Sequence, residues 1–230
     1  MEIFQTIWTA MTTQNELIST IIFFPMYFID TLVNMLLFTT ILNITVSKRA
    51  KTVYVLAMGS IAFLSRTFIS DPFGSFLNIL IGFFLIKFIL HSSWLKALLS
   101  EFITITVSII LELFLQKICL DLLQISYDSI MYVPIFRLIL SLTIYLFIYL
   151  LYRTIKYFKF HINLDYMTRK NKVLFIINSV LGIITIATQI YLMAFYNDRL
   201  PFYITIITML SLLAYFIISF YSLLSTNKLD

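Results

Sequence analysis

Five polar residues recur at steps of three and four inside the otherwise apolar stretch 94–120. They are Glu101, Thr104, Ser108, Glu112 and Gln116. Residues with this spacing share one face of an α-helix. Carboxylates in an apolar helix are costly unless they face a bundle interior or water, so they often mark ligand or ion sites. The stripe therefore predicts a helix that presents two carboxylates to the inside of a helical bundle.

Two further apolar stretches carry polar faces, which we expect to face the polar stripe of 94–120. Tyr27, Asp30 and Asn34 share a face of 20–45, and Asn178, Gly182, Thr185 and Gln189 share a face of 173–195. A mixed-charge cavity between such faces would suit a polar or peptide ligand. The candidate ligand-binding residues are Asp30, Asn34, Glu112, Gln116, Arg137 and Gln189.

A structural role is the alternative for each of these charged residues. Asp30 and Glu112 could serve only in hydrogen bonds between helices. Arg66, Lys117 and Arg137 lie near the ends of predicted helices, where long basic side chains can reach the membrane interface.

The remaining reactive residues do not form a recognisable catalytic or metal-binding pattern. Cys119 is the one cysteine, which excludes a disulfide framework. His91 and His161 have no second ligand at metal-binding spacing, and the four glycines are scattered singly. No serine has a nucleophile-elbow context. We expect no catalytic residues, no metal and no cofactor.

The composition excludes a soluble globular domain. Hydrophobic residues make up 61% of the 230-residue chain and charged residues only 12%, against about a quarter charged in soluble domains. A membrane span needs about 20 apolar residues and should be helical. We expect an all-α, polytopic transmembrane bundle of about seven spans, with six as the alternative. The expected ranges are 20–45, 52–69, 73–90, 94–120, 133–152, 173–195 and 201–224.

The basic residues predict the orientation of these spans, because Lys and Arg near a span stay on the cytoplasmic side. The segment 153–172 carries six of them, and alternation then places 12 of the 16 Lys and Arg inside. This puts the N-terminus outside and the C-terminus inside. Pro25, Pro72, Pro134 and Pro201 would lie near the outer starts of the odd-numbered spans. The net charge of +5 belongs to these loops and predicts no nucleic-acid partner.

The ends of the chain complete the expected organisation. Apolar residues on one face of 2–11 predict a short helix that lies in the membrane interface. No repeat or linker divides the chain, so 1–230 is expected to be a single transmembrane domain.

Two segments resemble a known family. FFPMYFIDTLVNMLLFTTIL in the first span, and DRLPFYITIITMLSLLAYFIISFYSLLSTNKLD at the end, are similar to the membrane sensor region of quorum-sensing histidine kinases of the AgrC and ComD type. The resemblance implies a sensor in the cell membrane of a Gram-positive bacterium, with an extracellular peptide ligand. It allows a homodimer as well. The chain has neither a phosphoacceptor motif nor an ATP-binding box, so kinase activity is not expected of it.

Three functions are therefore compared. The first is a sensor module of a two-component-type system, which would relay ligand binding through its last helix to a cytoplasmic partner or kinase domain. The second is a transporter, or the substrate-binding subunit of a vitamin importer. The third is a structural membrane partner with no ligand, in which neighbouring side chains would occupy all the space along the polar stripe.

Overall fold

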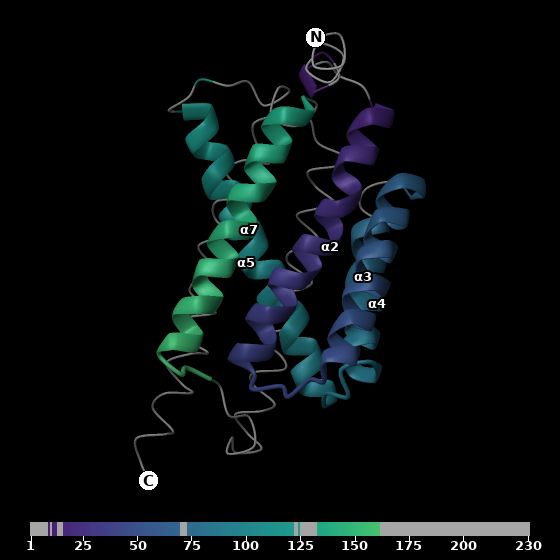
Figure 1. Ribbon diagram of the computed structural model, residues 1–230, viewed down its shortest axis with the longest axis vertical. Helices are drawn as coiled ribbons and strands as arrows, with labels where there is room; N and C mark the ends of the chain where they lie inside the picture. Colours follow the sequence, from purple (N-terminus) through teal and green to yellow (C-terminus); the bar gives the residue numbers. More distant parts are fainter. Residues whose placement is uncertain are drawn as a thin grey trace.

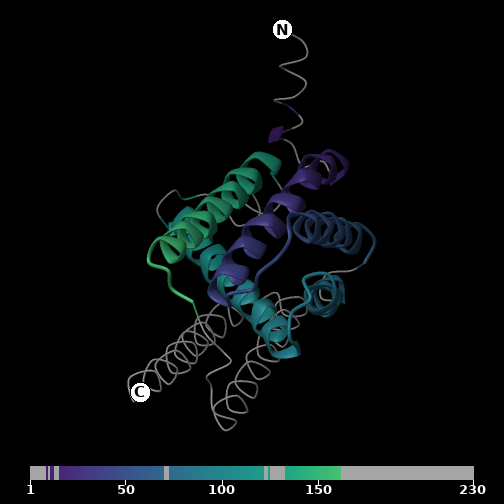
Figure 2. The same cartoon turned by 60° about the horizontal axis from the view of Figure 1, so that its bottom comes forward.

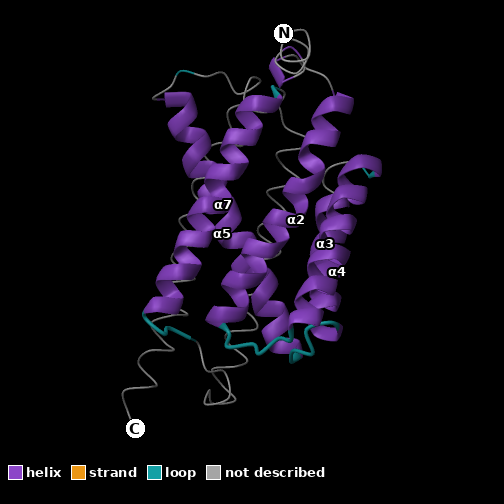
Figure 3. Ribbon diagram, viewed as in Figure 1, coloured by secondary structure: helices purple, strands orange, loops and turns teal. Residues whose placement is uncertain are grey.

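The computed structural model describes residues 9, 11–12, 16–69, 73–121, 124 and 133–161. This part of the chain contains five long α-helices and no strand (Figure 3). They are α2 (Glu16–Ile41), α3 (Lys48–Phe68), α4 (Phe73–Phe88), α5 (Trp94–Asp121) and α7 (Pro134–Tyr157). The all-α expectation is confirmed for the described residues.

The five helices pack as a closed ring. Each contacts the next in the order α2, α3, α4, α5, α7, and α7 returns to α2, while α2 also contacts α5 across the ring. Figures 1 and 2 show the helices running in alternating directions. We call the end where α2 and α7 begin the upper end. The loops 42–47 and 89–93 and the end of α7 form the lower end (Figure 1).

Local sequence signals begin and end these helices. The hydroxyl of Ser47 accepts a hydrogen bond from the backbone N–H of Ala50, which caps the start of α3. Pro134 is the first residue of α7. Proline is favoured there because a backbone N–H at that position would have no acceptor within the helix. Asn43 and Lys159 have φ angles of 48° and 51°, so α2 and α7 both end on a residue in the left-handed conformation.

The packed core lies toward the lower end. The second half of α2 supplies Met35, Leu37 and Phe38, all 1% exposed or less, and Leu99 and Ile148 join them from α5 and α7. In lipid, such contacts act through van der Waals packing and not through removal of apolar surface from water. The tight lower core leaves the upper half of the ring available for a cavity.

Small residues let neighbouring helices approach closely. Gly59 of α3 faces the ring of Phe28 on α2, and Gly82 of α4 lies against the carboxyl group of Glu101 on α5. The hydroxyl of Ser65 on α3 donates a 2.8 Å hydrogen bond to Oδ1 of Asn78 on α4. These contacts resemble the small-residue and polar contacts by which membrane helices associate.

Three described helices are long and apolar enough to cross a membrane: Phe23–Ile41, Trp94–Glu112 and Pro134–Tyr157. The shorter α4 has 16 residues, and α3 carries Lys48, Arg49, Lys51 and Arg66. Large apolar side chains on the outer surface of α7, such as Leu146 and Phe147, are exposed, as a lipid-facing surface requires.

The first five expected helices are present among the described residues in the expected order, but only three of them are long and apolar enough to cross a membrane. Their ends move by up to five residues, since α2 begins at Glu16 and α7 continues to Tyr157. The expected helices at 173–195 and 201–224 lie outside the described residues. So does the interfacial helix at 2–11, apart from residues 9 and 11.

The proline expectation is wrong for one of the four residues. Pro134 starts α7 as expected, but Pro25 lies inside α2, nine residues after its first residue. The helix begins earlier than the expected start at residue 20, because the chain from Glu16 to Phe24 is helical without interruption. Pro72 and Pro201 lie outside the described residues.

Candidate functional site

A cavity of about 200 Å³ opens between four helices in the upper half of the ring. We call it the charged cavity. Its walls come from α2, from the last turn of α3, from the second half of α5 and from the first half of α7. The lining residues are Phe23, Met26, Tyr27, Asp30, Arg66, Ser108, Glu112, Arg137, Leu140, Ser141, Ile144 and Tyr145.

The cavity contains two acidic and two basic side chains. Asp30 and Glu112 supply two carboxylates, and Arg66 and Arg137 supply two guanidinium groups. Both arginines interact favourably with Glu112, Arg66 also interacts favourably with Asp30, and the two acidic groups repel each other. The four groups come from four different helices, so their arrangement depends on how α2, α3, α5 and α7 pack together.

Aromatic rings hold part of the charged lining in place. The guanidinium carbon of Arg137 lies 4.6 Å from the centroid of the Phe23 ring, in a cation–π contact between α7 and α2. The ring of Tyr27 lies against that of Phe63 on α3, with centroids 6.1 Å apart. These contacts tie α2 to both of its neighbours at the depth of the cavity.

Asp30 is positioned by Asn34, one helical turn further along α2. The side-chain amide of Asn34 donates a 2.9 Å hydrogen bond to Oδ1 of Asp30. Asn34 is only 4% exposed and does not line the cavity. Its own carbonyl oxygen is buried without a hydrogen-bond partner, as is the hydroxyl of Thr106 on α5. Asn34 therefore lies beneath the cavity and contacts Asp30, and it is not part of the cavity lining as the described residues form it.

The structure brings together three of the six predicted site residues. Asp30, Glu112 and Arg137 line the same cavity. Gln116 belongs to α5 one turn beyond Glu112, and its side chain is not described. Gln189 lies outside the described residues, as does the whole polar face of 173–195.

The polar stripe of α5 serves two different surfaces. Ser108 and Glu112 line the charged cavity, as a stripe facing the interior predicts. Glu101, two turns before Ser108, is 6% exposed and packs against Gly82 of α4 instead. The stripe keeps one face of α5, but that face meets α4 at the depth of Glu101 and the charged cavity at the depth of Ser108 and Glu112.

Two groups of lining residues were missed from the sequence. Arg137, Ser141 and Tyr145 recur at steps of four along α7, a signal that could have extended the prediction from Arg137 to its whole face. Arg66 was not among the candidate ligand-binding residues, because its place near the end of a helix left an interfacial anchor as an alternative. Only the three-dimensional packing of α3 against α2 shows that it lines the cavity.

The described residues contain no group of three His, Cys, Asp or Glu side chains that could hold a metal ion. Cys119 is a free, partly buried thiol on α5. The charged and hydroxyl groups that line the charged cavity can form ion pairs and hydrogen bonds.

Comparison with known proteins does not assign the chain to a family. No protein-family model matches it, and neither a curated protein nor a solved structure shows significant similarity.

Proposed function

We propose that this chain is the ligand-receiving module of a membrane sensor, of the kind that serves two-component signalling. One observation carries the proposal: two carboxylates and two guanidinium groups from four helices line one cavity. A ligand that bridges these groups favours one packing of the helices over another, which is the requirement for relaying a signal. The AgrC and ComD resemblance supports the same class, with the last helix passing the change to a cytoplasmic partner or kinase domain.

The proposed topology has seven spans in the cell membrane of a Gram-positive bacterium, with the N-terminus outside and the C-terminus inside. Its support is the charge distribution. The lower end carries many of the basic residues: Lys48, Arg49, Lys51, Lys87, Lys96, Arg153, Lys156 and Lys159. None of the acidic residues lies in 42–47, 89–93 or 153–161. The positive-inside rule then makes the lower end cytoplasmic and the charged cavity extracellular.

The size of the cavity limits what enters it. At about 200 Å³ it is smaller than the roughly 300–1,000 Å³ of sites that enclose a drug-sized ligand. We therefore propose that a short extracellular peptide inserts one chain end or one polar side chain. The rest of the peptide would lie outside the cavity.

The test measures thermal stabilisation of the full chain, purified in detergent, by a synthetic pool of short peptides. A pool that raises the melting temperature of the wild type should leave Asp30→Asn and Glu112→Gln variants unshifted. Glu101→Gln is the matched control, because it makes the same chemical change on α5 outside the cavity. Equal stabilisation of the wild type and both cavity variants would refute the site.

A second candidate is the substrate-binding subunit of an importer, and one observation favours it. Pro25 removes one hydrogen bond from the continuous helix α2 above Asp30, because it has no N–H to donate to the carbonyl of Ile21. Interrupted helices are common at transporter sites. Uptake of a labelled amino acid or vitamin by vesicles containing only the purified chain would favour this function over the sensor.

A further inference from the structure

A second charged hollow, which we call the lysine cavity, lies at the lower end of the bundle. It has a volume of about 320 Å³ and is bounded by the last turns of α2, the first turn of α3 and the end of α7. Lys51, Lys156, Lys159 and His161 supply its basic groups. Thr39 and Thr40 add hydroxyls, and Leu36, Ile44 and Phe160 add apolar surface. The lining of the lysine cavity is therefore complementary to a ligand with an anionic part and an apolar part.

The lining of this cavity contains three lysines and no carboxylate among the described residues. Lys156 is held in place by Tyr152: its ammonium donates a 3.2 Å hydrogen bond to the phenol oxygen and lies 5.6 Å from the ring centroid. Three ammonium groups around one hollow repel one another. An anion placed between them would relieve that repulsion.

The C-terminal ends of α2 and α7 lie beside the cavity, and free carbonyl groups there would repel an anion. That repulsion is reduced, because hydrogen bonds occupy carbonyls in both ends. The N–H of Ile44 donates to the carbonyl of Thr39 at 2.8 Å, and the N–H of Phe160 donates to that of Ile155 at 3.0 Å. These bonds close α2 and α7 in the Schellman arrangement and occupy carbonyls that would otherwise face the cavity. Lys159 is the left-handed residue that ends α7, so the same motif brings its side chain to the cavity.

The depth of the lysine cavity matches the headgroup layer of a bilayer. Two candidate spans, Phe23–Ile41 and Pro134–Tyr157, end beside it. Tyr157 and Phe158 are 81% and 72% exposed at the end of α7, in the position typical of aromatic residues at a membrane interface. A group bound here would lie beside phospholipid headgroups, with acyl chains along the exposed apolar surface of α7.

We propose that the lysine cavity binds the phosphate-bearing headgroup of an anionic phospholipid. Basic pockets between membrane helices at the cytoplasmic end commonly bind such headgroups. The proposal concerns the lower end of the bundle and does not depend on the ligand of the charged cavity. One bound lipid headgroup would contact the adjoining ends of α2, α3 and α7.

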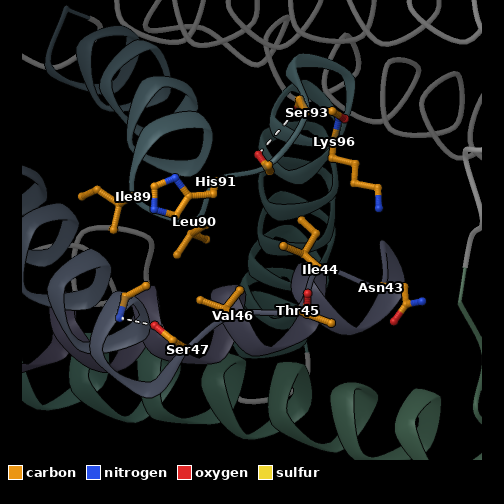
Figure 4. A pocket seen from close by; sticks show the side chains of 12 residues that line it. Asn43, Ile44, Thr45, Val46, Ser47, Ile89, Leu90, His91, Ser93 and Lys96 are labelled. Carbon is orange, nitrogen blue, oxygen red and sulfur yellow. Dashed lines mark hydrogen bonds between the residues drawn. The ribbon is translucent and has the colours of Figure 1, made fainter.

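A neighbouring hollow at the same end is a weaker candidate. This loop cavity, of about 440 Å³, lies between the loops 42–47 and 89–93 (Figure 4). Lys96 is its one lysine. Ser47 and Ser93 accept hydrogen bonds from the backbone N–H groups of Ala50 and Lys96, so the caps of α3 and α5 are occupied internally. The charge needed to hold a phosphate is concentrated in the lysine cavity.

The experiment uses native mass spectrometry of the full chain in detergent, titrated with phosphatidylglycerol or phosphatidylcholine. The cavity variant is Lys51→Gln/Lys156→Gln/Lys159→Gln. The matched control is Lys48→Gln/Arg49→Gln/Arg153→Gln, which removes the same three positive charges from exposed positions at the same end but outside the cavity. Circular dichroism and gel filtration check that both variants remain folded.

The wild type and the control should bind phosphatidylglycerol well above phosphatidylcholine. Loss of three lysines, each contributing roughly fivefold, should weaken binding by the cavity variant on the order of a hundredfold. A variant with arginine at the same three positions should bind as the wild type does, because arginine also pairs with phosphate.

Three results would overturn the proposal. Equal weakening in the cavity and control variants would mean general charge attraction. Equal binding of the two lipids would exclude recognition of the headgroup charge. Competition by inorganic phosphate at the same concentration as phosphatidylglycerol would identify a soluble anion as the ligand in place of a lipid.

Discussion

The contact between Gly59 and Phe28 determines how closely α3 approaches α2, and thus where Arg66 and Asp30 lie in the charged cavity. A Cβ added at Gly59 would lie 2.6 Å from Cδ1 of Phe28, where ordinary contact begins at 3.4 Å. The ring would have to retreat by about 0.8 Å. It cannot do so easily, because it already packs against the ring of Phe24 at a centroid distance of 5.0 Å.

Two opposing effects determine the outcome of Gly59→Ala. Overpacking of this kind costs about 1–3 kcal/mol. Replacement of a helical glycine by alanine gains about 1 kcal/mol in helix propensity. The single variant should therefore range from unchanged to about 2 kcal/mol less stable. In a Phe28→Leu background the clash is removed, and the same change should stabilise the protein by about 1 kcal/mol.

The assay is a double-mutant cycle on the full chain in detergent, followed by thermal unfolding. The coupling between Gly59→Ala and Phe28→Leu should be at least about 1 kcal/mol, equivalent to a difference of about 2–4 °C in melting temperature for a chain of this size. Additive effects of the two substitutions would refute the close approach of α2 and α3. The same result would contradict the packing that brings Arg66 near Asp30.

Two further substitutions test the contacts that support the site. Ser65→Ala removes the hydrogen bond to Asn78 and should lower the stability of the protein by about 0.6 kcal/mol in the same thermal unfolding assay. Thr67→Ala is the control: it loses only a hydrogen bond within α3 and should have a smaller effect. Asn34→Leu removes the hydrogen-bond donor to Asp30 and should abolish the stabilisation of the chain by peptide. Circular dichroism should show that the variant is still folded. Unchanged stabilisation by peptide would contradict a role for Asn34 in positioning Asp30.

The sequence predicted the helices well because each signal is local. The apolar stretches, the proline at the start of α7 and the basic loops all act within a few residues, and the first five expected helices are present in order. Pro25 was misplaced because proline favours a first turn but does not exclude the interior of a long helix, where neighbouring helices can compensate.

The charged cavity was predictable only in part, because it depends on which helices become neighbours. Spacing along a helix correctly selected Asp30 and Glu112 as facing the interior. Spacing alone does not distinguish a residue that lines a cavity from one that packs on a glycine, which is why Glu101 and Glu112 have different surroundings. Arg66 lies near a helix end, where a cavity residue and an interfacial anchor look the same in sequence.

The central claim is that the charged cavity faces the outside of the cell and the lysine cavity faces the inside. It is tested most directly by cysteine labelling in intact cells, in a Cys119→Ser background. Glu112 is an exposed residue of the charged cavity, and Lys159 is an exposed residue of the lysine cavity. A membrane-impermeant maleimide should label Glu112→Cys in intact cells and Lys159→Cys only after permeabilisation. The reverse pattern would contradict both the topology and the proposed receptor.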